Sequence, residues 1–253
     1  MKKVTLILFI LLIANLTYGQ ENENRLDGIG QQIETLLTSY KAVGLSVAIV
    51  KNDKVIYSKG FGYRNLKEKL PTTANTIFPI GSATKAFTAS LLGILESQSK
   101  ISLKEKPSFY IPKLQFYNDK MDDLVKIEDL LSHKSGLGGL GGTLILFPEN
   151  DRHKTIERLK YLKPNGAIND SWIYSNMGFT IAGTIIEQVT NESWDKNIKT
   201  NIFSPLNMTN SFTTLKEMKS TNNFSFGYGL SNEKIEKVLY EDYWYIPMMT
   251  QFH

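Results

Sequence analysis

Residues 78–89 read Phe-Pro-Ile-Gly-Ser-Ala-Thr-Lys-Ala-Phe-Thr-Ala, and this stretch decides how the rest of the chain is interpreted. Ser82 and Lys85 lie three positions apart, which places their side chains on one face of a helix. Gly81 permits a tight turn into that helix. A serine hydroxyl becomes a useful nucleophile only when a base lies within hydrogen-bond reach. The spacing therefore predicts an activated serine at a helix start, with a simple helix cap as the alternative.

The Ser-x-x-Lys spacing is a weak signal by itself, because the chain holds three further copies of it. Those copies lie near helix ends or in polar segments, where solvated side chains are the ordinary case: Ser97/Lys100, Ser193/Lys196 and Ser231/Lys234. Ser82 instead opens a run that is apolar nearly all round. Such a run predicts a buried central helix from Ser82 to about Ser97.

The first nineteen residues have the pattern of a secretory signal peptide. Lys2 and Lys3 form its basic start, and Val4–Ala14 is an apolar core of eleven residues, too short to span a membrane comfortably. A polar segment follows Gly19, so we expect cleavage near this position, with an uncleaved anchor as the alternative. The remaining residues, 20–253, are expected to form one globular unit without a stable membrane span. We expect an exported protein in a bacterial periplasm or outside the cell.

Composition narrows the range of partners. The formal net charge is +4, and it falls to about +2 when Lys2 and Lys3 leave with the signal peptide. No basic tract stands out, so nucleic acid is not an expected partner. Cysteine is absent, which excludes disulfides and a lipid-modified N-terminal cysteine. Three scattered histidines offer no ligand cluster, so we expect no metal and no cofactor, and a metal-dependent hydrolase is disfavoured.

Apolar spacing predicts the main elements of the chain. A β-hairpin is expected where residues 45–50 and 55–57 flank the polar turn 51–54, while residues 62–75 look like a polar loop. Gly138–Gly142 is expected to form a glycine-rich bend. Helices are expected at residues 26–40, 127–131, 177–189 and 194–203, and short strands in the aromatic tail 222–245.

Tyr174 and Asn176 are candidates for the rest of the site. They lie between a turn-rich stretch and an apolar helix. An ammonium within about 4–6 Å of a phenol favours the phenolate, which is a usable base. Lys85 would itself be the base if burial favours its neutral amine. For Tyr174 the alternative is a packed tyrosine before a capped helix. The similar Tyr63-Arg64-Asn65 lies in the polar loop and is interpreted as a turn.

Residues 78–89 resemble the nucleophile segment of the class C β-lactamase-like serine hydrolases, a group that includes penicillin-binding proteins, D-alanyl-D-alanine carboxypeptidases and related esterases. Residues 129–137, 174–176 and 203–209 are similar to further motifs of that family, in the same order. The resemblance implies an α/β (α+β) fold of the β-lactamase/transpeptidase type, with an antiparallel sheet packed on helices and an all-helical region. It also implies that Ser82 is acylated, that Lys85 and Tyr174 share proton transfer, and that Asn176 orients the substrate.

The sequence departs from the family in one respect. A third motif, Lys-Thr-Gly or His-x-Gly, is absent before His253. In the family this motif lies on a strand that supplies one oxyanion-hole amide, and loss of one such donor costs about 10²–10³ in turnover. We therefore expect a C-terminally truncated member of the family that lacks the later strands of the sheet.

Two functions remain open at this stage. The first is a serine hydrolase that forms an acyl-enzyme on Ser82, with β-lactams, D-Ala-D-Ala peptides of the peptidoglycan type or small esters as substrates. The second is a truncated relative that is inactive or only binds ligands. The sequence does not distinguish among the three substrate classes.

Overall fold

A computed structural model describes residues 26–138 and 152–238. The predicted signal peptide at 1–19, the bend at 139–142 and the tail after Val238 lie outside the described residues. The chain divides into two compact units. The described residues of the first unit are 26–76 and 228–238, and those of the second fall within 77–227.

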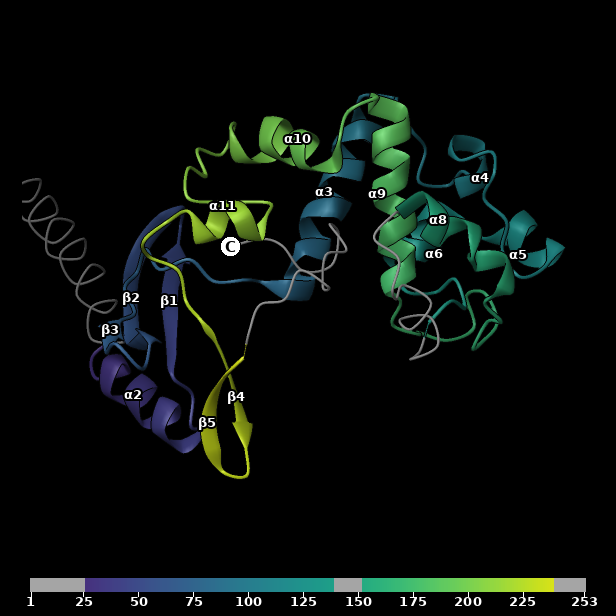
Figure 1. Ribbon diagram of the computed structural model, residues 1–253. Helices are drawn as coiled ribbons and strands as arrows, with labels where there is room; N and C mark the ends of the chain where they lie inside the picture. The colour runs from purple at the N-terminus through teal and green to yellow at the C-terminus, as the bar shows by residue number, and fades with distance from the viewer. Residues whose placement is uncertain (1–25, 139–151, 239–253) are drawn as a thin grey trace, which may run out of the picture. The chain divides into compact units, whose positions relative to one another are not determined.

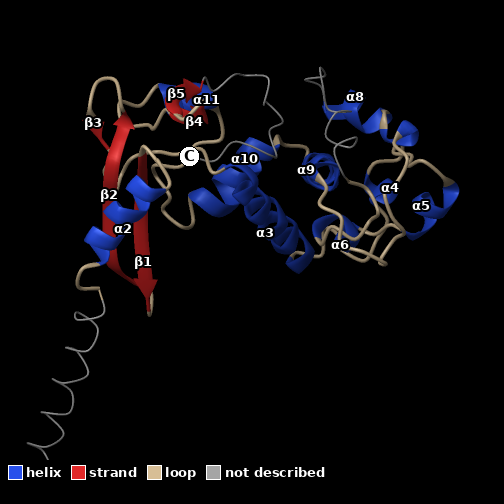
Figure 2. Cartoon of the chain, turned by 90° about the horizontal axis from the view of Figure 1, so that it is seen from below, coloured by secondary structure: helices blue, strands red, loops and turns tan. Residues whose placement is uncertain are grey.

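The first unit contains an antiparallel sheet with strand order β1-β2-β3, formed by β1 (Gly44–Lys51), β2 (Lys54–Asn65) and β3 (Leu70–Pro71). The predicted hairpin is confirmed, and its two turn residues, Asn52 and Asp53, both have positive φ, as a two-residue hairpin turn requires. Helix α2 (Ile29–Ser39) packs on this sheet (Figure 2). Ile33 and Leu37 of α2 are buried with Phe61 of β2, which anchors the helix.

The expected loop at residues 62–75 is wrong in its first part. Strand β2 continues to Asn65, and Tyr63 and Asn65 pair with Pro71 and Leu70 of β3. Asn65 is buried and its side-chain oxygen accepts the N–H of Glu68 at 3.2 Å. The polar residues Tyr63-Arg64-Asn65 resemble a loop in the sequence, but they form the end of β2. The polar side chain of Asn65 can be buried there because it is hydrogen-bonded to a residue nearby in the sequence.

The second unit is mainly helical. Its longest helices are α3 (Thr84–Ser97) and α9 (Asn176–Thr190), which lie in contact (Figure 1). A 3₁₀ turn (Gly81–Ala83) leads into α3, a second 3₁₀ turn covers Leu159–Tyr161, and a π-helical turn (Lys199–Phe203) follows α10. The shorter helices are α4 (Pro107–Tyr110), α5 (Asp119–Leu124), α6 (Ile127–Leu131), α8 (Arg152–Glu157), α10 (Trp194–Ile198) and α11 (Leu215–Lys219).

Strands also form beyond the N-terminal hairpin. β4 (Gly227–Ser231) and β5 (Lys234–Val238) make a separate two-stranded sheet, within the described part of the aromatic tail where short strands were expected.

Helix α9 is the centre of the second unit's core. Every residue from Met177 to Ile186 is buried. A Cβ atom at Gly178 would lie 2.8 Å from the carbonyl oxygen of Leu130, so glycine permits the close contact of α9 with α6. Trp194 of α10 is fully buried, and its indole N–H donates to Thr88 of α3 at 3.2 Å. These contacts fix α3 against α9 and α10.

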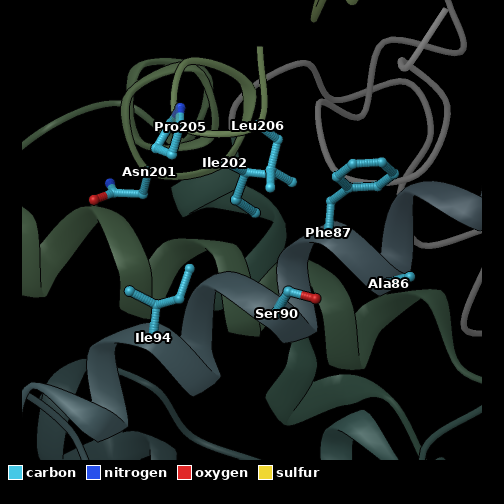
Figure 3. Close-up of a pocket in the computed structure, with 8 residues that line it drawn as sticks. All are labelled: Ala86, Phe87, Ser90, Ile94, Asn201, Ile202, Pro205 and Leu206. Carbon is cyan, nitrogen blue, oxygen red and sulfur yellow. The ribbon is translucent and has the colours of Figure 1, made fainter. Parts of the chain in front are cut away.

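The prediction that α3 is buried nearly all round is wrong for one face. Leu91, Leu92 and Leu95 are buried, but Ala86 and Ser90 are exposed. The open face borders an apolar cavity of about 340 Å³ between α3 and the chain that follows α10 (Figure 3). Its lining residues are Ala86, Phe87, Ser90, Ile94, Asn201, Ile202, Pro205 and Leu206. None of these described lining residues is titratable, and none of them is a predicted catalytic residue.

Leu91 offers a test of this core. Its side chain is fully buried, whereas Leu124 in α5 is 50% exposed. We expect Leu91→Ala to lower the free energy of unfolding by about 2–5 kcal/mol, because it removes buried methyl groups and leaves a cavity. Leu124→Ala, the same substitution on an exposed helix residue, should change it by less than about 0.5 kcal/mol. Urea denaturation of both variants measures the difference, and equal losses would contradict the described packing.

Within residues 26–138 and 152–238, no helix combines the length and apolar character required to cross a bilayer. The same residues contain no group of three or more His, Asp or Glu side chains arranged to hold a metal ion.

Candidate active site

Ser82 lies at the entrance to α3. It is the middle residue of the 3₁₀ turn Gly81–Ala83, and its side chain is exposed. Gly81 has φ of 52°, in the left-handed region that glycine adopts without strain. The predicted tight turn at this glycine is confirmed. The turn presents the Ser82 hydroxyl to solvent at the start of the helix.

Lys85 lies one turn after Ser82 and is only 7% exposed. Its Nζ donates a hydrogen bond to Ser82 Oγ at 3.1 Å. The rings of Tyr174 and Phe179 also face the amine, with their centroids 4.9 and 5.5 Å from Nζ. No ion pair joins Lys85 to a carboxylate in the described part of the chain. The charge of Lys85 therefore acts chiefly on Ser82 and the aromatic rings around it.

Tyr174 reaches the same hydroxyl from a distant part of the sequence. It precedes α9, and its phenol O–H donates to Ser82 Oγ at 2.7 Å. Ser82 Oγ thus has the amine on one side and the phenol on another. The structure brings together the three residues predicted to be catalytic, while their catalytic roles stay predictions.

Asn176, the first residue of α9, has a different environment. Its side-chain oxygen is buried and has no hydrogen-bond partner among the described residues. No hydrogen bond joins the Asn176 side chain to Ser82, Lys85 or Tyr174 within that part of the chain. A buried acceptor without a donor is unfavourable by about 1–3 kcal/mol. The predicted role of Asn176 in orienting substrate stays a prediction.

His133 is a residue of this site that the sequence reasoning did not select. Its ring packs against that of Tyr174 with centroids 4.7 Å apart, and it also contacts the rings of Trp172 and Phe179. Its Nδ1 accepts the backbone N–H of Ser175 at 3.1 Å. Burial and the nearby charge of Lys85 lower the pKa of His133 below its usual value. The available signal was its place in residues 129–137, one of the segments that resemble the family.

The chain after α6 runs along the segment that carries Tyr174. The carbonyl of Lys134 accepts the N–H of Asn169 at 2.8 Å, and the carbonyl of Gly136 accepts that of Asn165 at 3.0 Å. Ser175 then caps α9, because its hydroxyl accepts the N–H of Gly178 at 3.2 Å. These bonds hold the approach to α9 at both ends, which fixes where Tyr174 can lie.

The arrangement supports nucleophilic chemistry at Ser82. Two groups that can carry a proton contact Oγ directly, and general acid–base catalysis requires contacts of this length. The exposed hydroxyl is open to a carbonyl substrate. A cation beside the hydroxyl also favours the negative charge that develops on an attacking oxygen.

Comparison with known proteins gives a family match. A family model described as Beta-lactamase matches residues 29–224. The protein flp of Staphylococcus aureus (strain COL) is 29% identical over 210 residues, covering 79% of this chain and 41% of that protein. A beta-lactamase of Pseudomonas fluorescens is 30% identical over 191 residues, covering 75% of this chain and 51% of that enzyme.

A solved structure agrees with these matches. The octameric penicillin-binding protein homologue from Pyrococcus abyssi is 27% identical with a TM-score of 0.79, covering 89% of this chain and 52% of that one. The present chain spans about half the length, or less, of the curated relatives cited above.

Proposed function

The chain belongs to the Beta-lactamase family, and we propose that it is a serine hydrolase that forms an acyl-enzyme on Ser82. The observation that carries the proposal is the meeting of the Tyr174 hydroxyl and the Lys85 amine at Ser82 Oγ, at 2.7 and 3.1 Å. Family membership and the TM-score of 0.79 also confirm the predicted β-lactamase/transpeptidase-like α/β fold, an antiparallel sheet with helices.

The proposed acylation uses these three side chains. Ser82 Oγ attacks the substrate carbonyl, and its proton passes to the phenolate of Tyr174 or to a neutral Lys85 amine. The tetrahedral intermediate then collapses, the bond from the carbonyl carbon to the leaving nitrogen or oxygen breaks, and the leaving group takes up the proton. Water attacks the acyl-enzyme in the same way and regenerates the Ser82 hydroxyl.

Lys85 serves either version of this scheme. As an ammonium, it favours a phenolate at Tyr174, because an opposite charge at close range stabilises the anion. As a neutral amine, it would accept the Ser82 proton directly along the 3.1 Å contact. Both versions remain open, and both require Lys85, Tyr174 and Ser82 to stay in contact.

The proposed substrates are β-lactams, D-Ala-D-Ala peptides of the peptidoglycan type or small esters. The relatives support this range, because one is a beta-lactamase and another is a penicillin-binding protein homologue.

We also propose that the protein is exported. The proposal rests on the basic start at Lys2 and Lys3 and on the apolar core Val4–Ala14. Cell fractionation and the N-terminal mass of the native protein test it. A protein that remains in the cytoplasm with Met1 in place would contradict it.

The acyl-enzyme itself is the decisive test of function. We expect incubation with benzylpenicillin, a D-Ala-D-Ala peptide or a phenyl ester to add the mass of one acyl group, and peptide mapping to find that group on Ser82. Stopped-flow measurement should show a burst of released product. Adducts only at other residues, or no adduct with any of the three classes, would contradict the proposal. Saturable binding without an adduct would instead support the ligand-binding alternative.

A further inference from the structure

His133 lies at the turn that ends helix α6. It has φ of 61°, and the N–H of the following residue, Lys134, donates to the carbonyl of Asp129 at 2.8 Å, the pattern of a left-handed helix C-cap. The turn places both the backbone carbonyl and the ring of His133 beside the segment before α9.

His133 forms hydrogen bonds to the segment before α9 at two residues, Ile173 and Ser175. Its backbone carbonyl accepts the N–H of Ile173 at 2.9 Å, and its ring Nδ1 accepts the N–H of Ser175 at 3.1 Å. Ser175 has extended backbone angles. In an extended segment, successive side chains point to opposite faces. The imidazole Nδ1 therefore accepts a hydrogen bond from this segment at the position where a neighbouring β-strand would place its next carbonyl oxygen.

Tyr174 lies between the two residues that His133 holds. Its ring also packs on the imidazole, with centroids 4.7 Å apart and planes inclined at 39°. The other end of the same side chain donates to Ser82 Oγ at 2.7 Å. No hydrogen bond joins His133 to Ser82 in the described part of the chain, so its structural effect on the reaction passes through Tyr174, while its charge also acts on Lys85.

We propose that His133 is a positioning residue whose neutral imidazole, unprotonated at Nδ1, holds Tyr174 against Ser82. The inference rests on the proposed function of Ser82 as nucleophile. It adds the requirement that His133 is unprotonated at Nδ1, because the Ser175 N–H needs an acceptor there. A proton on Nδ1 would turn this acceptor into a donor and break the bond that fixes residues 174–176.

The charges around His133 support the neutral form. Lys85 of α3 is the charged side chain that acts on the imidazole, and Tyr174 is the titratable group packed against it, beside Phe179 of α9. Burial first and the charge of Lys85 second lower the pKa of His133 below 6.5. Since the unfolded chain binds the proton more readily, protonation of His133 destabilises the folded site as the pH falls below about 6.5.

Two substitutions at position 133 distinguish the effect of losing the hydrogen-bond acceptor from the effect of losing the titratable group. In His133→Asn, the amide oxygen replaces Nδ1 as acceptor, does not titrate, and sits on a residue that tolerates positive φ. In His133→Gly, the backbone is unstrained but the acceptor is lost. We expect His133→Asn to acylate within about tenfold of wild type and His133→Gly to be slowed about 100-fold, since a small misplacement of a reacting group has such an effect.

The pH dependence of acylation gives the more specific result. The acid limb of the wild-type rate should move to lower pH or disappear in His133→Asn. His153→Asn in α8, the same change at an exposed histidine, should keep the wild-type profile. Equal rates for the Gly and Asn variants, or an unchanged acid limb in His133→Asn, would overturn the inference.

A measurement that does not depend on turnover distinguishes this inference from the proposed function. The ¹⁵N shifts of the imidazole should show His133 neutral at pH 7, with the proton on Nε2. A proton on Nδ1 at that pH would refute the positioning role even in an active enzyme. The expected tautomer in a protein that forms no acyl-enzyme would instead refute the proposed function.

Discussion

Ser82→Ala is expected to abolish acyl-enzyme formation. The substitution removes the atom that the Lys85 amine and the Tyr174 hydroxyl both contact, at 3.1 and 2.7 Å. Loss of a catalytic nucleophile in a serine hydrolase lowers turnover by about 10⁶-fold, so any remaining ester hydrolysis should be close to the uncatalysed rate. Labelling with a fluorescent penicillin or a fluorophosphonate measures the effect directly. Wild-type labelling of the variant would exclude Ser82 as nucleophile.

Ser97→Ala provides the matched control for that experiment. Ser97 belongs to another Ser-x-x-Lys copy and lies at the end of the same helix, α3. Its hydroxyl is exposed and donates to the carbonyl of Ile94 at 2.7 Å. This variant should label like wild type. A shared loss in both variants would point to damage of α3 instead of removal of a nucleophile.

Lys85→Met should produce the second largest loss. Methionine is unbranched and apolar, so it fills the space among the rings of Tyr174 and Phe179 without the amine. We expect acylation to slow by about 10²–10⁴-fold, the usual range for removing a group that transfers a proton. The free energy of unfolding should be unchanged or higher, because a buried charge without a carboxylate partner in the described residues is removed. Single-turnover kinetics and urea denaturation together measure both effects.

Two further variants make the Lys85 result interpretable. Lys100→Met changes an exposed lysine of the Ser97 copy and should leave acylation unaffected. Tyr174→Phe keeps the ring that contacts Lys85 and His133 but removes the hydroxyl. A larger loss in Tyr174→Phe than in Lys85→Met would favour the phenolate as base. Acylation of Lys85→Met at the wild-type rate would remove Lys85 from the mechanism.

Local patterns in the sequence predicted local features well. The apolar spacing of residues 26–40, 127–131 and 177–189 corresponds to α2, α6 and α9 in the structure. The contact of Ser82 with Lys85 was predictable because it lies within one turn. Tyr174 was found through the Tyr-x-Asn pattern before an apolar helix and through the family resemblance.

Features that depend on how segments pair in three dimensions, whether near or distant in the sequence, were missed. Asn65 was assigned to a polar loop because its burial depends on pairing with Leu70 and on a local bond to Glu68. The open face of α3 was not predicted because an apolar helix carries no sign of which side its neighbours leave uncovered. His133 escaped notice because its partner is a backbone N–H 42 residues away, and a backbone group has no sequence signature.

The bond between Tyr174 and Ser82 spans 92 residues of sequence, whereas the one between Lys85 and Ser82 spans three. A growing polypeptide emerges from the ribosome with its N-terminal part first, and long-range contacts form late because loop closure is entropically unfavourable. The serine and its lysine neighbour are therefore assembled well before the phenol arrives. Until that late closure, the Ser82 hydroxyl lacks its contact with the phenol, so the full set of three contacting groups exists only after the segment before α9 has folded against α3.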